Sequence, residues 1–208
     1  MTELMPGTEE KFKDITTYLR AYASDCDVLL WKPTSWYGQI IARSTDGPFS
    51  HATAALKWNG TVMSVGFEEG RGAVVEPLRS VIQRFPGIVS VFRPGNGFNS
   101  VEVKAAMLDD LTGTYQWANI RLFVLLHLPL TKIFFPRFVR SRIKAASHRT
   151  AGGICSQWVA RSFHMQGRGF PLLNKPPAII SPNDLATSPK LQYLYTLNDS
   201  ARLIGLLA

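Results

Sequence analysis

The 208-residue sequence is poor in the residue types from which metal centres are built. Its two cysteines, Cys26 and Cys155, lie far apart and form no CxxC pair, and its four histidines are scattered along the chain. Zinc-type sites need Cys and His ligands at short, regular spacings, so we expect no metal site. There is also no glycine-rich nucleotide-binding loop and no internal repeat, and we therefore expect no cofactor.

Long apolar runs are lacking as well. The longest nearly uncharged run, residues 122–131, is too short to span a bilayer, which needs about 20 apolar residues. The first residues show no basic stretch followed by an apolar one, so no secretory signal is visible. The sequence thus predicts a cytoplasmic protein without a transmembrane helix.

Acidic residues are absent from residues 131–150, a stretch that contains several of the lysines and arginines behind the net charge of +8. This basic stretch follows the apolar run, and apolar surface beside positive charge suits binding at the interface of an anionic membrane. The alternative is a buried core helix followed by a solvated basic loop. Nucleic acid is the less favoured partner, because charge alone does not select it.

The stretch of residues 150–165 predicts a helix with a cysteine at its beginning. Gly152 and Gly153 interrupt what precedes, and the following apolar residues recur at helical spacing. At a helix start, unpaired N–H groups and the helix dipole favour the thiolate form of Cys155. The same N–H groups can bind the oxyanion that forms when a thiolate attacks a carbonyl. The alternative is a buried structural cysteine, which is common.

The middle of the chain predicts a mostly antiparallel sheet. Cys26 precedes a short apolar strand, and the flanking carboxylates Asp25 and Asp27 disfavour its thiolate, so we interpret Cys26 as structural. His51 opens a second strand, which leads to Asn59-Gly60, the strongest hairpin signal in the sequence.

A two-residue loop at Asn59-Gly60 fixes the register of the strands on either side. Counting outward, Ala55 lies opposite Ser64 and His51 lies opposite Glu68. Directly opposite residues are close enough for the Glu68 carboxylate to reach the His51 imidazole. A bulge at Gly66 would shift this pairing by one residue. The face that carries Ser64 holds only small residues along the hairpin, so we expect the helix of Cys155 to pack there.

The order of these elements resembles that of the circularly permuted papain-like cysteine hydrolases of the NlpC type. The nearest likeness is to the YiiX-like branch, which is related to the lecithin retinol acyltransferase-like proteins. The resemblance rests on Ser50-His51, Phe67-Glu68 and Cys155-Ser156, with residues 113–115 and 181–184 as weaker support. It implies an α+β fold in which an antiparallel sheet packs against a helix carrying the nucleophilic cysteine.

In such families the histidine precedes the cysteine in the chain and a third polar group orients the imidazole. The resemblance therefore implies that Cys155 is the nucleophile, His51 its general base and Glu68 the third catalytic residue. Relatives have a small residue where this sequence has Glu69, so the choice between Glu68 and Glu69 stays open. Ser64 is a further alternative without charge, and both glutamates can equally be solvated turn residues.

The resemblance also sets the expected domain organisation and function. We expect an N-terminal helix in residues 1–24 and one permuted papain-like domain in residues 25–208, with a helical, basic insertion around residues 101–150. The expected activity is hydrolysis or acyl transfer on an amide or ester through a thioester, with a peptide, cell-wall peptide or lipid ester as substrate. The alternative is an inactive papain-like module that binds an anionic membrane or polymer through its basic segment.

Overall fold

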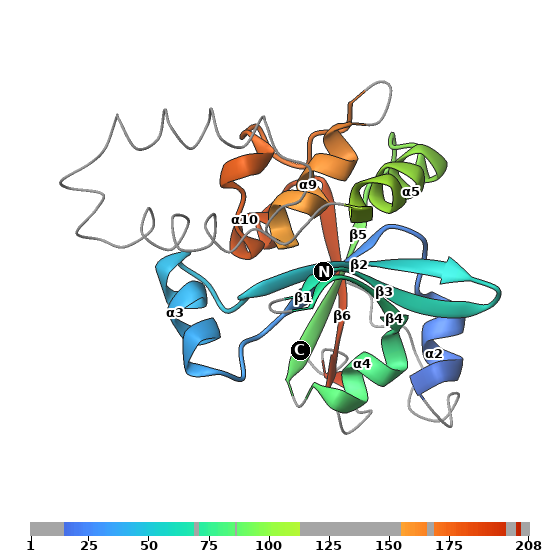
Figure 1. Ribbon diagram of the computed structural model, residues 1–208, viewed down its shortest axis with the longest axis horizontal. Coiled ribbons are helices and arrows are strands. Elements are labelled where there is room, and N and C mark those ends of the chain that lie inside the picture. Colours follow the sequence, from blue (N-terminus) through green and yellow to red (C-terminus); the bar gives the residue numbers. More distant parts are fainter. Residues whose placement is uncertain are drawn as a thin grey trace, which may run out of the picture.

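The computed structural model describes residues 15–68, 71–85, 87–112, 155–165, 169–198 and 203–204. In these ranges seven strands form one sheet in the order β4-β3-β2-β1-β5-β6-β7. Every neighbouring pair of strands is antiparallel. Helices α9, α10 and α5 lie on one side of the sheet, and α4 and α2 lie on the other (Figure 1). The predicted α+β fold with an antiparallel sheet is confirmed.

The strands follow the hydrophobic pattern of the sequence. Their bounds are β1 Asp27–Trp31, β2 His51–Trp58, β3 Thr61–Glu68, β4 Gly72–Pro77, β5 Ile88–Pro94, β6 Leu191–Asn198 and β7 Leu203–Ile204. All five residues of β1 are buried, because this strand lies in the centre of the sheet and is covered on both faces. Asn59 and Gly60 both have positive φ, 46° and 75°, as a two-residue hairpin turn requires.

The helices begin and end at recognisable signals. Their bounds are α2 Ile15–Tyr22, α3 Trp36–Ser44, α4 Leu78–Arg84, α5 Ser100–Asp109, α9 Cys155–His164 and α10 Pro182–Ala186, with short 3-10 turns η1 Asp110–Thr112 and η2 Pro177–Ile179. Helix α9 begins at Cys155, as predicted. Ser181 caps α10 and forms a capping box with Asp184, with Pro182 in the first turn.

Two apolar cores lie on opposite faces of the sheet. The larger joins α9 and α5 to the sheet and includes Val28, Leu30, Ala52, Ala54, Leu56, Phe67, Trp158, Val159 and Phe163. The smaller joins α4 and α2 to the other face and includes Leu19, Leu29, Trp31, Ala55, Leu78, Val81 and Ile82. The indole of Trp158, which is fully buried, meets the ring of Phe67 edge-on, with ring centroids 6.0 Å apart. This contact anchors α9 on the hairpin.

The predicted packing face of the cysteine helix is wrong. Helix α9 packs against the β2 face that carries Ala52 and Ala54. Thr53 lies on the opposite face, where its hydroxyl accepts a hydrogen bond from Trp31. Both faces of β2 carry small side chains, so the alternation of residues did not indicate which face the helix covers. The large side chains Trp31 and Trp158 decide it, because each fills one face.

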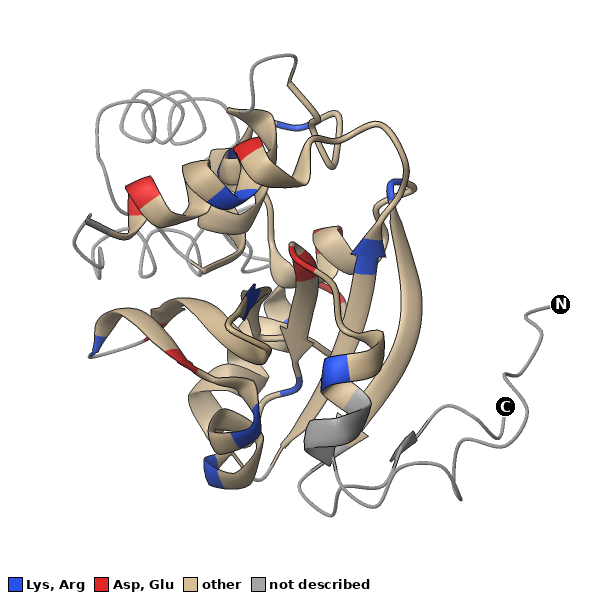
Figure 2. Cartoon of the chain, turned by 90° about the vertical axis from the view of Figure 1, so that its right-hand side faces the viewer, with Lys and Arg blue, Asp and Glu red and all other residues tan. Residues whose placement is uncertain are grey.

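No helix in the described ranges is both long enough and apolar enough to cross a membrane. Lysine, arginine, aspartate and glutamate are spread over helices and strands in the view of Figure 2. The basic stretch and most of the predicted insertion fall on residues 113–154, which lie outside the described residues, as does the first part of the predicted N-terminal helix.

Candidate active site

Cys155 and His51 meet at the end of strand β2. Cys155 is the first residue of α9, and His51 is the first residue of β2. Both line one cavity of about 300 Å³, to which β1, α3, β3, α4 and α10 also contribute. The thiol and the imidazole are close enough to share a hydrogen bond.

The surroundings of Cys155 favour its thiolate. Its side chain is almost completely buried, with 4% of the residue surface exposed, and burial by itself opposes ionisation. The charge and hydrogen bond of His51, together with hydrogen bonds from the backbone of Ala52 and Ser156, outweigh that burial and lower the pKa of the Cys155 thiol. A hydrogen bond that stabilises a thiolate must be donated to it, so these backbone groups are N–H donors.

Cys26 provides the opposite case in the same chain. It is fully buried directly before β1, and its Sγ lies 3.6 Å from the carbonyl oxygen of Ser100. Burial, and then the charges of Asp25 and Asp27, raise the pKa of the Cys26 thiol to about 12. Its burial and raised pKa agree with the interpretation of Cys26 as a structural cysteine.

The hairpin register agrees with the prediction as far as the ladder runs. Trp58 pairs with Thr61 and Ala55 with Ser64, without a shift, and the pairing of β2 with β3 ends at Ala54 and Val65. Gly66 then crosses close over Thr53, where a Cβ on the glycine would lie 2.9 Å from the threonine Cγ2. Strand β3 continues in its pairing with β4 as far as Glu68 opposite Gly72.

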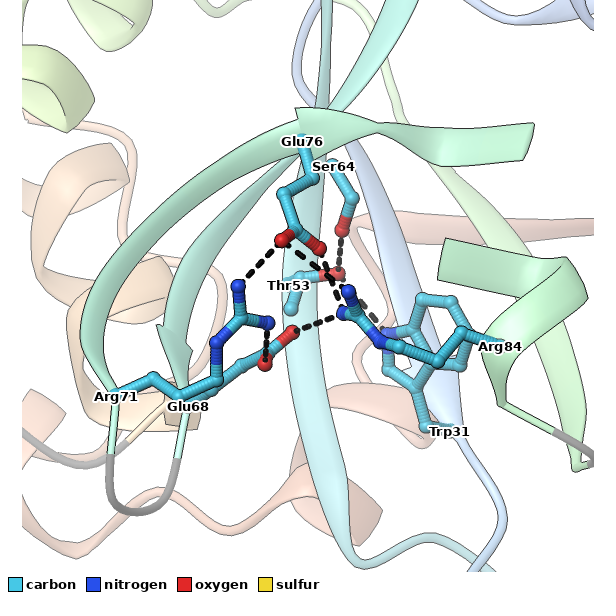
Figure 3. A network of polar contacts seen from close by, with 7 residues as sticks. All are labelled: Trp31, Thr53, Ser64, Glu68, Arg71, Glu76 and Arg84. Atoms are coloured by element: carbon cyan, nitrogen blue, oxygen red, sulfur yellow. Dashed lines mark hydrogen bonds and ion pairs between the residues drawn. The ribbon is translucent and has the colours of Figure 1, made fainter. Parts of the chain in front are cut away.

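Glu68 lines the same cavity as Cys155 and His51. Its carboxylate forms ion pairs with Arg71 at 2.8 Å and with Arg84 at 3.7 Å. Glu76 binds the same two guanidinium groups, which gives a network of two acids and two bases on one face of the hairpin (Figure 3). The structure thus brings Glu68 to the cavity and surrounds it with arginines. Glu69 lies outside the described residues.

Ser64 occupies a second layer behind the cavity. Its hydroxyl donates to Oγ1 of Thr53 at 3.0 Å, and the same oxygen accepts from the indole N–H of Trp31 at 2.9 Å (Figure 3). Thr53 and Trp31 line the cavity. Sequence reasoning placed Thr53 on the small-residue face of the hairpin but singled out neither Trp31 nor Arg84. The alternation of a strand indicates Thr53, two residues after His51, whereas nothing in the sequence indicates Arg84.

Comparison with known proteins tests the fold. No protein-family model matches this chain, and no curated protein sequence matches it. Among solved structures, the crystal structure of the metalloprotein YiiX from Escherichia coli O157:H7 aligns with a TM-score of 0.55 and 14% identity, over 82% of this chain and 96% of that one. This chain has the YiiX fold. The resemblance to the permuted papain-like proteins of the NlpC type is therefore confirmed at the level of the fold.

At 14% identity the likeness to YiiX shows the fold and does not extend to substrate or activity. The description of YiiX as a metalloprotein applies to that protein. In the part of this chain that the structure describes, no group of three or more His, Cys, Asp or Glu side chains is arranged to hold a metal ion. These residues do not offer the ligand set of a typical zinc site.

Proposed function

We propose that this protein is a cysteine hydrolase or acyltransferase that acts on an amide or ester through a thioester on Cys155. The observation that carries the proposal is the pairing of a buried thiol with His51 in one cavity, which lowers the pKa of that thiol. Burial without such a partner does the opposite, as Cys26 demonstrates. A low thiol pKa is the property that a cysteine nucleophile needs.

The proposed reaction has two halves. His51 accepts the proton of Cys155, and the thiolate attacks the substrate carbonyl, whose oxygen takes up the negative charge. Backbone N–H groups around the start of α9 bind this oxyanion. The C–N or C–O bond then breaks, and the leaving group departs with the proton from His51. Water attacks the thioester in the hydrolase, and an alcohol or amine does so in the acyltransferase, again with His51 as base.

Glu68 is the proposed third residue, with a charge that stabilises the imidazolium of His51. Two facts support Glu68 over Ser64: Glu68 lines the cavity, and the Ser64 hydroxyl is engaged with Thr53. Arg71 and Arg84 compete for the same carboxylate. We therefore expect loss of Glu68 to cost less activity than loss of His51 or Cys155.

The lining of the cavity favours a substrate with an apolar group next to the scissile carbonyl. Trp31 and Phe85, whose rings meet edge-on at 5.2 Å, form part of the wall, together with Ile41 and Val81. Such walls bind alkyl or aromatic groups, because burying apolar surface contributes about 25 cal/mol per Å². This favours a lipid or other hydrophobic ester, or a peptide with an apolar side chain, over a strongly polar cell-wall peptide.

The experiment that tests the function traps the thioester. The full chain is mixed with p-nitrophenyl esters and with p-nitroanilides of apolar acids, and the release of p-nitrophenol or p-nitroaniline is followed together with the intact mass. We expect a burst of p-nitrophenol and a mass increase of one acyl group on Cys155. Cys155→Ala should abolish both, whereas Cys26→Ala should leave both unchanged. A wild-type chain that gains no acyl group and releases no product above the Cys155→Ala rate would refute the proposal.

A further inference from the structure

A single amide side chain holds the loop that leads into His51. Asn183 in α10 is buried, and its Oδ1 accepts from the N–H of Phe49 at 2.9 Å while its Nδ2 donates to the carbonyl oxygen of Phe49 at 2.9 Å. Nδ2 also donates to Oγ1 of Thr45 at 2.6 Å. The amide therefore pairs with both the N–H and the carbonyl oxygen of Phe49, as a neighbouring strand would.

The loop before His51 packs closely against this amide. A Cβ on Gly47 would lie 2.4 Å from Oδ1 of Asn183, so the loop approaches the amide where only glycine is tolerated. Phe49 is two residues before His51, and the N–H of Ser50 donates to the carbonyl oxygen of Trp31 at 3.0 Å. The backbone that enters His51 is thus fixed by Asn183 and by strand β1.

The segment before Asn183 holds the cysteine side of the site. The hydroxyl of Ser156, the residue next to Cys155, donates to the carbonyl oxygen of Ile180 at 2.7 Å, and Ser156 is completely buried. Gln157 donates to the carbonyl oxygen of Ala178 at 2.6 Å. Residues 178–183 therefore contact both the start of α9 and the loop of His51, although these two segments are more than a hundred positions apart in the sequence.

We propose that Asn183 is a positioning residue that sets the distance between the Cys155 thiol and the His51 imidazole, by holding the His51 loop to the segment that also binds Ser156. The inference rests on the proposed function, because it concerns the same pair. Asn183 itself is not among the residues that line the cavity. Pro182, the residue before it, does line the cavity, so the segment also forms part of the site.

Loss of Asn183 should weaken the interaction between the Cys155 thiol and the His51 imidazole. If Asn183 is lost, the loop of residues 45–50 is free to shift, and the charge of His51 acts on Cys155 from a greater distance. Coulomb interactions fall with distance, whereas the burial of Cys155 on α9 stays. The thiol should then titrate at higher pH, even in a variant that remains fully folded.

The test compares Asn183→Ala with Ser188→Ala in the full chain. Ser188 is a matched control, because its buried hydroxyl donates to the carbonyl oxygen of Leu172 at 2.5 Å and does not line the cavity. The readouts are the Tm and the pH midpoint of Cys155 alkylation by iodoacetamide. We expect both variants to lower the Tm, but only Asn183→Ala to raise the midpoint, by about one unit or more, which means tenfold less thiolate well below the midpoint.

Ser156→Ala provides a second variant on the opposite side of the segment, should Asn183→Ala fail to fold. It removes a single hydrogen bond from the start of α9, and we expect it to raise the same midpoint while Ser188→Ala does not. The proposal is overturned if the foldable variant leaves the midpoint at the wild-type value, or if Ser188→Ala raises it equally. Because alkylation needs no substrate, this result is separate from the thioester test: a chain that forms no thioester can still show the coupling.

Discussion

Replacement of His51 by alanine is the most direct probe of the candidate site. In the wild type, burial raises the pKa of Cys155, and the charge and hydrogen bond of His51 together with hydrogen bonds from the backbone of Ala52 and Ser156 bring it below the ordinary value. Alanine removes the charge and the hydrogen bond of His51, while the thiol stays buried at the start of α9. The pKa should therefore move from below the ordinary thiol value of about 8.5 to above it.

The size of the effect follows from the contribution of a neighbouring opposite charge, which typically changes a pKa by about 1–3 units. For a change of about two units, the thiolate fraction at pH 7 falls roughly 100-fold. Each remaining thiolate is more nucleophilic, with a Brønsted slope of about 0.4–0.5, which returns about tenfold of that loss. We expect the alkylation rate of Cys155 at pH 7 to fall roughly tenfold.

The assay measures both cysteines in one sample. The protein is treated with iodoacetamide between pH 5 and pH 10, and the peptides that contain Cys155 and Cys26 are quantified by mass spectrometry. With a thiol pKa near 12, Cys26 should stay almost unmodified throughout, which shows that the chain remains folded. His51→Gln, which keeps a polar side chain without the charge, should give the same shift as His51→Ala.

Two results would refute the reasoning. One is a wild-type Cys155 that is alkylated with a midpoint at or above the ordinary thiol value. The other is a midpoint that is the same in wild type, His51→Ala and His51→Gln while Cys26 stays protected. Either would mean that His51 does not stabilise the thiolate, and the proposed nucleophile would lose its activating base.

Two further predictions concern the framework of the site. Gly66→Ala places a Cβ 2.9 Å from Cγ2 of Thr53, so we expect overpacking of about 1–3 kcal/mol and a Tm lower by about 2–10 °C. Thr53→Ser removes that methyl group and should partly restore the Tm. An unchanged Tm in Gly66→Ala would contradict the close crossing of β3 over β2. Hydrogen bonds from Arg84 and then Arg71 lower the pKa of Glu76 to about 2. This carboxylate therefore stabilises the fold above its unfolded pKa of about 4.3, and its contribution to the free energy of unfolding disappears as the pH falls toward 2. The difference in free energy of unfolding between wild type and Glu76→Gln should accordingly be largest above pH 5, at no more than about 1 kcal/mol for a pair at the surface, and should disappear in acid. A difference that grows in acid would show the opposite sign.

Local signals allowed the sequence to predict much of the fold. Asn59-Gly60 specifies a two-residue turn, and a turn of fixed length determines which residues of β2 and β3 pair, down to Ala55 opposite Ser64. The glycines before Cys155 and the apolar spacing after it predicted the start of α9. Ser181 followed by Pro182 is typical of a helix start, and the short helix α10 begins there.

Local signals of this kind do not predict contacts between segments that are distant in the sequence. The pairing of β2 and β3 ends before His51 and Glu68, and Arg84, from a helix that the sequence did not predict, lies at the carboxylate of Glu68. Asn183 binds Phe49 across 134 positions, and nothing local distinguishes it from any other asparagine after a proline.

The sequence by itself determined most of the elements and the hairpin register, and the resemblance carried by its motifs indicated the two residues, Cys155 and His51, on which the chemistry is proposed to depend. The elements and the register follow from turn geometry and helix ends, which act over a few residues. Only the tertiary structure decided that α9 covers the Ala52 face of β2, and which side chains surround the thiol and the imidazole. Packing volume and the pairing of buried polar groups fix those contacts, and both depend on the whole folded chain.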